Sequence, residues 1–195
     1  MPKTIKKFRV TTDSRNSKKP AENQLNRDFS SSRYNEKWVT DVTYIPTREG
    51  WLFLVAVLDL FSRRIVGWSM GDRLTSELSK RALRDALKRR GNVNGLLHHS
   101  DQGREYYAPN YQELLKENGI VCSMSRKGNC WDNTVMESFF HSLKAEQVNH
   151  DDYRMRTEAE AGAAVFNYIE IFYNRKRRHS SIEYLSPVDY ETIYT

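Results

Sequence analysis

Two different spacings of apolar residues divide the chain, and each predicts its own kind of element. Between residues 38 and 70 the apolar residues come in short runs rich in β-branched and aromatic side chains, which is typical of strands. The apolar residues of Trp38–Ile45 fall at both parities, which predicts a central strand covered on both faces and ended by Pro46. Strands over Trp51–Leu58 and Arg64–Met70 follow after short links, so we expect an antiparallel meander.

Further along the chain, the spacing becomes that of amphipathic helices separated by short strands. The first helix is expected to start after Thr75 or Ser76 and to stop before Gly91, because these residue types cap helix ends. Thr157–Glu160 fits a capping box for the last helix. The expected elements are a helix over 78–87, a strand over 95–99, a helix from 109 to 119, a strand over 120–124, a helix after residue 132 and a long helix over 157–173.

The resulting order, β-β-β-α-β-α-β-α-α, predicts the fold class. Three antiparallel strands followed by alternating helices and strands form an α/β protein, with a mixed five-stranded sheet flanked by helices on both faces. We divide the chain into a basic N-terminal arm over residues 1–33, which is extended or disordered, a core over 34–150, and a C-terminal helical extension of that core over 151–195.

The helix expected after residue 132 has two distinct faces. At 100° per residue its apolar side chains form one broad arc, which predicts a face packed on the core. Glu137, His141 and Lys144 fall together on the opposite face. A metal-binding carboxylate and a phosphate-binding lysine would therefore project from a firmly anchored helix. The residues of the apolar arc are Val135, Met136, Phe139, Phe140 and Leu143.

Glu137 also has a purely structural interpretation. Thr134–Glu137 fits a capping box, in which the glutamate would accept a hydrogen bond from the backbone N–H of the N-cap residue. Asp132 and Asn133 are alternative N-caps, so the helix does not require Glu137 for this purpose. This stretch alone leaves both interpretations open.

The net charge of the chain is concentrated at its N-terminus. The 195 residues carry a formal net charge of +6. Residues 1–20 hold seven Lys or Arg and one acid, so the rest of the chain is neutral on balance. A basic segment of this kind favours polyanions, most simply nucleic acid, and a solvated lead-in to the core is compatible with that role.

Other features argue against several classes of protein. The longest apolar run, Trp51–Leu58, is far too short to span a membrane, and no apolar segment follows the basic N-terminus as in a secretory signal. Cys122 and Cys130 form no C-x-x-C pair, and the five His show no zinc-binding spacing. We therefore expect free thiols and a reducing compartment.

Three acidic residues stand out by their positions. Asp41 interrupts a strand that is otherwise apolar or rich in Thr, Asp101 follows a short buried strand, and Glu137 lies on the outward face of a helix. Between Asp101 and Glu137 lie 35 residues. Mg²⁺ takes oxygen ligands and completes its shell with waters and phosphate oxygens, so three acids from separate elements can build such a site. Each can equally be a surface residue among the 25 acids of the chain.

Several motifs occur in a characteristic order, and they include the pair of acids separated by 35 residues. They are Trp38–Pro46, Asp59–Arg63, His98–Gly103, Ser123–Glu137, Tyr173–His179 and Leu185–Pro187. Together they resemble the integrase core of bacterial insertion-sequence transposases. More narrowly, they are similar to the second-frame (OrfB-type) transposases of elements with two overlapping frames. The resemblance covers roughly Lys7 to Tyr190.

This resemblance implies a ribonuclease-H-like fold and a DDE active site, in which Asp41, Asp101 and Glu137 hold two Mg²⁺ or Mn²⁺. In that family a water attacks a phosphodiester at the end of the element and frees a 3′-OH. The 3′-OH then attacks a second phosphodiester, which completes DNA transposition, integration or recombination. No covalent enzyme intermediate is expected.

The resemblance also implies DNA contacts. Lys144 matches a position where integrases place a lysine against DNA, and an ordinary solvated lysine is the alternative. The basic run Arg175–Arg178 is either a phosphate contact or a solvated helix end. The residues that we predict to bind DNA are Lys144, Arg175, Lys176, Arg177, Arg178, Lys3, Lys6, Lys7 and Arg9.

Several polar residues are expected close to the metal ligands without binding the metal. Adjacent strand residues point to opposite faces, so His98 and His99 are not expected to share one ion. One of them would orient a ligand or touch DNA, and the other would pack in the core. We place His99, His141 and Asn133 in the surroundings of the site and interpret Asp59 as a turn residue.

The implied partner is double-stranded DNA, both the terminal inverted repeats of the element and the target. We expect a homo-oligomer on DNA, without membrane contact, in the bacterial cytoplasm and associated with the nucleoid. Family members usually carry a helix-turn-helix-like region before the core, and this chain begins almost at the core. That region is therefore expected on a first-frame product or another polypeptide, or to have been removed by truncation.

Two alternatives remain open. One is a non-catalytic DNA-binding or assembly remnant, against which the complete set of three acids argues. The other is a nuclease of the same fold, which would cut DNA without joining it.

Overall fold

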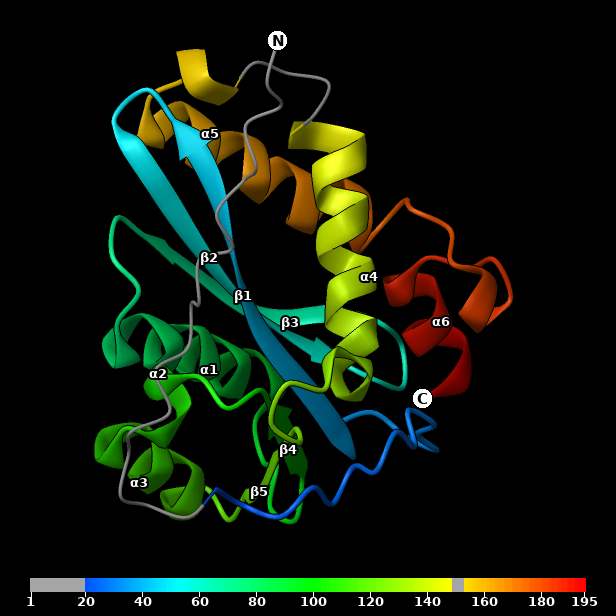
Figure 1. Cartoon of the computed structure of the whole chain (residues 1–195). Helices are drawn as coiled ribbons and strands as arrows, with labels where there is room; N and C mark the ends of the chain where they lie inside the picture. Colours follow the sequence, from blue (N-terminus) through cyan, green and yellow to red (C-terminus); the bar gives the residue numbers. More distant parts are fainter. Residues whose placement is uncertain (1–19, 149–152) are drawn as a thin grey trace, which may run out of the picture.

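The structure of the chain, a computed structural model, describes residues 20–148 and 153–195. Five strands form one sheet, and helices cover both of its faces (Figure 1). The strands are β1 Lys37–Thr47, β2 Gly50–Asp59, β3 Ile65–Gly71, β4 Leu97–Ser100 and β5 Val121–Met124. The α-helices are α1 Ser76–Arg90, α2 Arg104–Tyr107, α3 Pro109–Glu117, α4 Thr134–Leu143, α5 Glu158–Phe166 and α6 Pro187–Tyr194. Other helical turns lie at Cys130–Asn133, Lys144–Val148, Tyr153–Met155, Asn167–Tyr173 and Ser180–Ile182.

The sheet has the mixed character that the order of elements predicts. Its strand order is β3-β2-β1-β4-β5. β1 pairs antiparallel with β2, and β2 pairs antiparallel with β3, which confirms the meander. β4 runs parallel to β1, and β5 runs parallel to β4. Parallel neighbours need a crossover connection, and the chain crosses through α1 before β4 and through α2 and α3 before β5.

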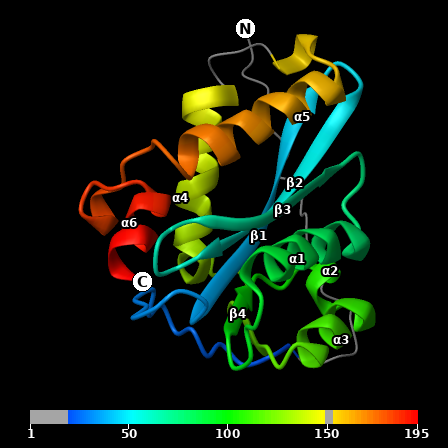
Figure 2. The same ribbon diagram turned by 180° about the vertical axis from the view of Figure 1, so that it is seen from behind.

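Helices α1 and α3 lie on one face of the sheet and α4 and α5 on the other (Figures 1 and 2), and a hydrophobic cluster lies on each face. One cluster joins the sheet to α1 and α3 and includes Trp38, Leu83 and Tyr111. The other joins the sheet to α4 and α5 and includes Val39 and Phe139. The adjacent residues Trp38 and Val39 belong to different clusters and both are fully buried. β1 is therefore a central strand covered on both faces, as predicted.

The ends of the elements follow local rules with one exception. Thr75 caps α1 by accepting a hydrogen bond from the Leu78 N–H at 3.2 Å, and Gly91 ends that helix at a φ of 70°. The prediction that Pro46 ends the first strand is wrong, because Pro46 lies within β1 opposite Trp51. β4 pairs only with the first residues of β1. Among the described residues, no strand pairs with the other edge of the far half of β1, and proline is tolerated at such an edge.

Residues 20–33 pack against the core, so the disordered alternative for the N-terminal arm does not hold there. They form no strand or helix, in line with the extended alternative. The backbone N–H groups of Gln24 and Leu25 donate to Ser123 Oγ at 2.9 and 3.2 Å, and Leu25 is buried. Arg27 Nε lies 2.9 Å from the buried carboxylate of Asp132. Residues 1–19 lie outside the described residues.

Buried polar groups attach the C-terminal segment to the sheet. Asn174 Oδ1 accepts a hydrogen bond from the Ile65 N–H at 2.9 Å, and Asn174 Nδ2 donates to the Ile65 carbonyl at 3.0 Å. Glu191 on α6 accepts hydrogen bonds from Ser62 Oγ at 2.7 Å and Arg64 Nη1 at 2.6 Å. These hydrogen bonds join the C-terminal segment to β3 and to the turn before it.

Within the described ranges, no helix combines the length and the apolar character that crossing a bilayer requires.

Cys122 on β5 is a free, half-buried thiol, and burial raises its pKa above the ordinary value. A buried thiol of this kind stays protonated and unreactive.

We expect Asn174→Ala to lower the free energy of unfolding by about 2–4 kcal/mol, because two buried backbone groups of Ile65 lose their partner. Asn167→Ala is the control, since Asn167 is exposed about two turns earlier and should change stability by less than about 0.5 kcal/mol. Urea denaturation measures both variants. Equal midpoints for the two would show that Asn174 does not hold the extension.

Candidate active site

The parallel pairing of β1 and β4 brings two of the predicted acids together. This register pairs Val39 with His99. Carried two residues further, it sets Asp41 beside Asp101, just after the end of β4. The carboxyl ends of parallel strands are the usual place for ligands in α/β sheets.

α4 contributes Glu137 to the same region. Phe139 and Leu143 are buried, while Glu137 is exposed on the other side of the helix, so the two predicted faces of α4 are confirmed. Asn133 is the N-cap of α4 and makes no side-chain capping hydrogen bond, and Thr134 already lies within the helix. The capping-box interpretation of Glu137 is therefore wrong.

The charges in this region act on one another. Burial is the largest cause that raises the pKa of Asp41 to about 8. The negative charges of Asp101, Glu105 and Glu137 raise it as well. The Val42 N–H, which donates to Asp41 Oδ1 at 2.8 Å, opposes part of this effect. The negative charges of three other carboxylates therefore all act on Asp41.

Glu105, on α2, is a carboxylate that sequence reasoning missed. Burial raises its pKa to about 7, and the charge of Asp101 adds to the shift. A Cβ placed on Gly103 would lie 2.5 Å from Glu105 Oε1 and 2.9 Å from Asp101 Oδ1. Glycine at this position lets both carboxylates approach the same backbone. Both also line a cavity of ≈ 350 Å³.

These carboxylates interact but do not form a complete ligand set. Among residues 20–148 and 153–195, no three Asp, Glu, His or Cys side chains lie close enough together to hold a metal ion. The available donors are nonetheless all carboxylate oxygens, which suit Mg²⁺ or Mn²⁺. A divalent cation would favour the ionised form of each acid and remove their mutual repulsion.

Lys144 lies close to the acids. Its Nζ is 5.2 Å from the centre of the Tyr44 ring. Burial lowers the pKa of Lys144, and the nearby charge of Asp41 opposes that shift. Lys144 is half-buried beside Asp41, and its contact with DNA stays a prediction.

Asn133 and His141 are placed differently around the site. Asn133 is buried, and its Nδ2 donates to the Thr40 carbonyl at 3.1 Å. Thr40 directly precedes Asp41, so this bond ties the start of α4 to the strand that carries the acid. His141 is exposed on α4, one turn after Glu137.

The two adjacent histidines bond to different partners, in line with the expectation that they share no ion. His98 Nε2 lies 2.6 Å from Tyr111 Oη. His99 Nδ1 and Nε2 lie 2.9 Å from Ser123 Oγ and 3.2 Å from Ser125 Oγ. Burial lowers the pKa of His98 to about 3 and that of His99 to about 4, so both rings are neutral at pH 7.

Asp59 serves a turn. Its Oδ1 accepts a hydrogen bond from the Phe61 N–H at 3.0 Å, and its Oδ2 accepts one from the Asn35 N–H at 2.8 Å. The carboxylate is fully buried and occupied by these backbone groups. This confirms the interpretation of Asp59 as a turn residue.

The four residues of the basic run Arg175–Arg178 differ in their surroundings, because Arg177 is paired and the other three are exposed. Arg177 Nη2 lies 2.7 Å from Glu146 Oε1 and 3.1 Å from Ser142 Oγ, so its guanidinium braces the end of α4. The other three members of the run are exposed. Their contact with DNA stays a prediction. Lys3, Lys6, Lys7 and Arg9 lie outside the described residues.

Comparison with protein families gives two matches. The integrase core domain matches residues 31–130 and, as a second family of the same description, residues 137–193. The first match contains Asp41 and Asp101, and the second begins at Glu137. All three predicted metal ligands therefore lie within the matched ranges.

Curated relatives are similar over most of the chain. It is 44% identical over 192 residues to the insertion element IS600 uncharacterized 31 kDa protein of Shigella sonnei, covering 98% of this chain and 70% of that protein. It is 45% identical over 169 residues to the transposase for insertion sequence element IS904 of Lactococcus lactis, covering 87% and 66%. It is 47% identical over 171 residues to the transposase InsF for insertion sequence IS3A of Escherichia coli, covering 88% and 59%. The chain thus spans 59–70% of the length of these relatives.

Solved structures share the fold at low sequence identity. The HTLV-2 integrase catalytic core domain, solved in complex with magnesium, matches with a TM-score of 0.63 and 16% identity, covering 83% of this chain and 99% of that chain. The catalytic core domain of BIV integrase matches with a TM-score of 0.59 and 18% identity, covering 82% and 95%. These neighbours confirm the ribonuclease-H-like fold.

Without metal, we expect the protein to lose stability as the pH rises from 3.8, the ordinary pKa of Asp41, to about 8, its pKa in the folded chain. Across this window the folded state binds more protons than the unfolded state, so unfolding becomes easier as the pH rises. The stabilisation is complete below the lower value and lost above the higher one. Asp41→Asn should flatten this dependence. Asp72→Asn, at an exposed acid, should leave it unchanged.

Melting temperatures in EDTA across this pH range measure the effect. A pH dependence that is the same in wild type and Asp41→Asn would contradict the raised pKa of Asp41.

Proposed function

This chain belongs to the integrase-core family of insertion-sequence transposases, and we propose that it is the catalytic core that cuts and joins DNA at the ends of such an element. One observation carries the proposal. β1, the residue after β4 and α4 each supply one acid, and the charges of Asp101 and Glu137 both act on Asp41. In this family, acids from three such elements form the DDE site.

Asp41, Asp101 and Glu137 are the proposed ligands of two Mg²⁺ or Mn²⁺. The family uses divalent metals, and the HTLV-2 integrase core was solved in complex with magnesium. When bound, such ions activate the attacking oxygen and stabilise the leaving oxygen of a phosphodiester. The donor set of this chain fits them, because oxygen ligands with open positions for water and phosphate are what Mg²⁺ prefers.

The reaction follows from two successive attacks at phosphorus. Water first hydrolyses a phosphodiester at the end of the element and leaves a 3′-OH. That 3′-OH then attacks a phosphodiester of the target; a new P–O bond joins the two DNAs, and the 3′-oxygen of the cut target strand leaves as a hydroxyl group. Asp41 must be ionised to bind a metal ion. Because burial raises its pKa to about 8, the site must favour the ionised carboxylate at neutral pH. A dependence on divalent cations follows from this requirement.

DNA would approach across α4. Lys144 places a positive charge beside Asp41, in a position to meet a phosphate next to the reacting one. The proposed partners are the terminal inverted repeats and target DNA, bound by a homo-oligomer associated with the nucleoid. A first-frame product or a separate helix-turn-helix region would supply base recognition, which needs an element placed in a groove.

Glu137→Gln should abolish metal-dependent cleavage and joining while the fold stays intact. We expect a loss of more than about 100-fold in rate, because groups that only orient a metal ligand already contribute 10–100-fold. Stability should change by less than about 0.5 kcal/mol, since Glu137 is exposed. The measurement is Mn²⁺-dependent cleavage and strand joining on DNA that carries the ends of the element.

Glu113→Gln is the matched control, an exposed glutamate on α3. A folded Glu137→Gln protein that cuts at the wild-type rate would overturn the DDE assignment. Cleavage by wild type without any joined product would favour the nuclease alternative.

Lys144→Ala should weaken DNA binding and lower the dependence of affinity on salt by roughly one unit on a double-logarithmic plot. Lys144→Arg should retain both, because it keeps the charge and the contact with the Tyr44 ring. Fluorescence anisotropy at several salt concentrations measures affinity and slope. If Lys144→Ala matches wild type in both, Lys144 makes no phosphate contact.

A further inference from the structure

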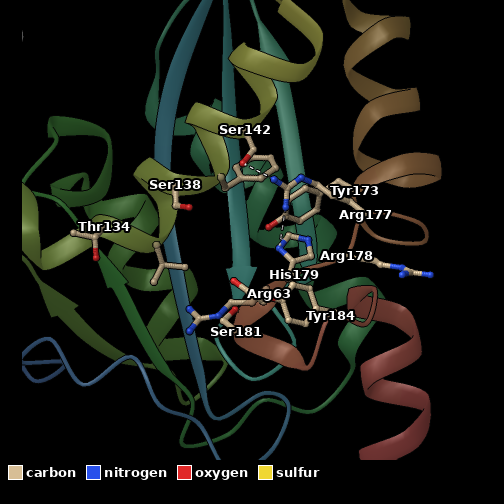
Figure 3. Close-up of a pocket in the computed structure, with 13 residues that line it drawn as sticks. Arg63, Thr134, Ser138, Ser142, Tyr173, Arg177, Arg178, His179, Ser181 and Tyr184 are labelled. Carbon is tan, nitrogen blue, oxygen red and sulfur yellow. Dashed lines mark hydrogen bonds between the residues drawn. The ribbon is translucent and has the colours of Figure 1, made fainter.

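A polar cavity of ≈ 570 Å³ lies beside α4, where three segments far apart in sequence meet (Figure 3). α4 contributes Ser138 and Ser142, the turn between β2 and β3 contributes Arg63, and the loop before α6 contributes His179 and Ser181. No residue of the described chain that lines this cavity is acidic. The cavity is therefore positively charged and rich in hydroxyl groups.

Two buried nitrogen atoms in this wall have no hydrogen-bond partner among the described residues. They are Arg63 Nη1 and His179 Nε2. Buried polar atoms are normally paired, so two such atoms at one cavity call for a ligand or an ion. Burial lowers the pKa of Arg63, yet a guanidinium remains charged at any physiological pH.

The hydrogen bond at Nδ1 of His179 decides whether the other ring nitrogen, Nε2, is a hydrogen-bond donor or an acceptor. Arg177 Nη1 lies 3.3 Å from His179 Nδ1. A guanidinium can only donate, so Nδ1 accepts and the proton of the neutral ring stands on Nε2. Both unpaired atoms are then N–H donors, and a ligand that satisfies them must bring acceptor oxygens.

The donors are fixed in place before any ligand arrives. Arg177 is held by Glu146 at 2.7 Å and by Ser142 at 3.1 Å, and it in turn orients the His179 ring. Arg63 lies in a turn with a left-handed φ of 62°. The Arg178 side chain, by contrast, points away from the cavity (Figure 3). Glu146 neutralises Arg177 but does not line the cavity, so Arg63 keeps its charge toward it. Fixed N–H donors in a wall without an acidic residue are typical of a site for an oxyanion.

We propose that this cavity binds a phosphate of the DNA backbone that neighbours the reacting phosphate, and so holds the DNA strand against α4. The inference rests on the proposed function. Ser138 directly follows Glu137, and successive residues of a helix are turned by about 100°. The cavity therefore lies on the stripe of α4 next to the stripe that carries Glu137. A strand that crosses α4 can meet both.

Arg63→Gln tests the proposal in the full chain with a fluorescent duplex. It should weaken binding roughly tenfold and lower the salt slope by roughly one unit, as expected for one lost charged contact to phosphate. Arg84→Gln is the matched control, because Arg84 lies on α1 across the sheet and pairs with Glu77. It should match wild type.

Ser181→Asp and Ser181→Asn test the same cavity through an exposed residue and remain informative where Arg63→Gln does not fold. The aspartate would occupy the donors and should reproduce the loss of affinity and slope, while the asparagine should not. Wild-type affinity in Arg63→Gln or Ser181→Asp would overturn the proposal. Unchanged DNA binding, with loss only of a melting-temperature rise caused by inorganic phosphate, would assign the cavity to free phosphate and overturn it too.

Failure of this proposal is distinguishable from failure of the proposed function. If the wild type cuts DNA with Mn²⁺ and the cavity variants bind DNA normally, only the proposal about the cavity is refuted. If the wild type neither binds nor cuts DNA, both the proposed function and the proposal about the cavity are refuted.

Discussion

Carboxylates that repel one another meet where β1, the end of β4 and α4 come together, and the surrounding structure holds them in place. Asp41 stands on a strand buried on both faces, where an apolar residue would stabilise the fold more. Asp101 and Glu105 approach it around Gly103, and the charges of both raise the pKa of Asp41. Such an arrangement costs stability, which proteins tolerate mainly at sites of function.

The surrounding structure keeps these acids from moving apart. Asn133 ties the start of α4 to β1 through the Thr40 carbonyl at 3.1 Å. The loop before α4 is fixed by the buried carboxylate of Asp132, which accepts hydrogen bonds from the Arg126 N–H at 2.9 Å and from Arg126 Nη2 at 2.7 Å. These bonds hold the pKa of Asp132 well below its ordinary value. These bonds fix the start of α4, the helix that carries Glu137.

Most of the fold could be predicted from the spacing of apolar residues, because that spacing reflects which faces are buried. It predicted the meander, the capped α1 and the two faces of α4. It did not predict α2 or α6, which are too short to show a helical period, and it misjudged Pro46 because edge pairing is not visible locally.

The candidate site was harder to predict than the fold, because local sequence patterns do not show which distant residues come together. Asp41, Asp101 and Glu137 were singled out by position, but only the resemblance to a known family joined them, since the parallel pairing of β1 and β4 is a long-range fact. Glu105 was missed because a single acid on a four-residue helix carries no signal in the sequence. The cavity formed by Arg63 and His179 joins distant segments, which no window of sequence reveals.

The central claim is that these acids bind divalent cations, and the location of bound Mn²⁺ tests it most directly. Anomalous diffraction from crystals of this chain soaked in Mn²⁺ would show each ion without reference to activity. The account predicts peaks at coordination distance, about 2.0–2.2 Å, from carboxylate oxygens of Asp41 and Asp101, with Glu137 turned toward them. A strong peak elsewhere, with none at Asp41 under saturating Mn²⁺, would contradict it.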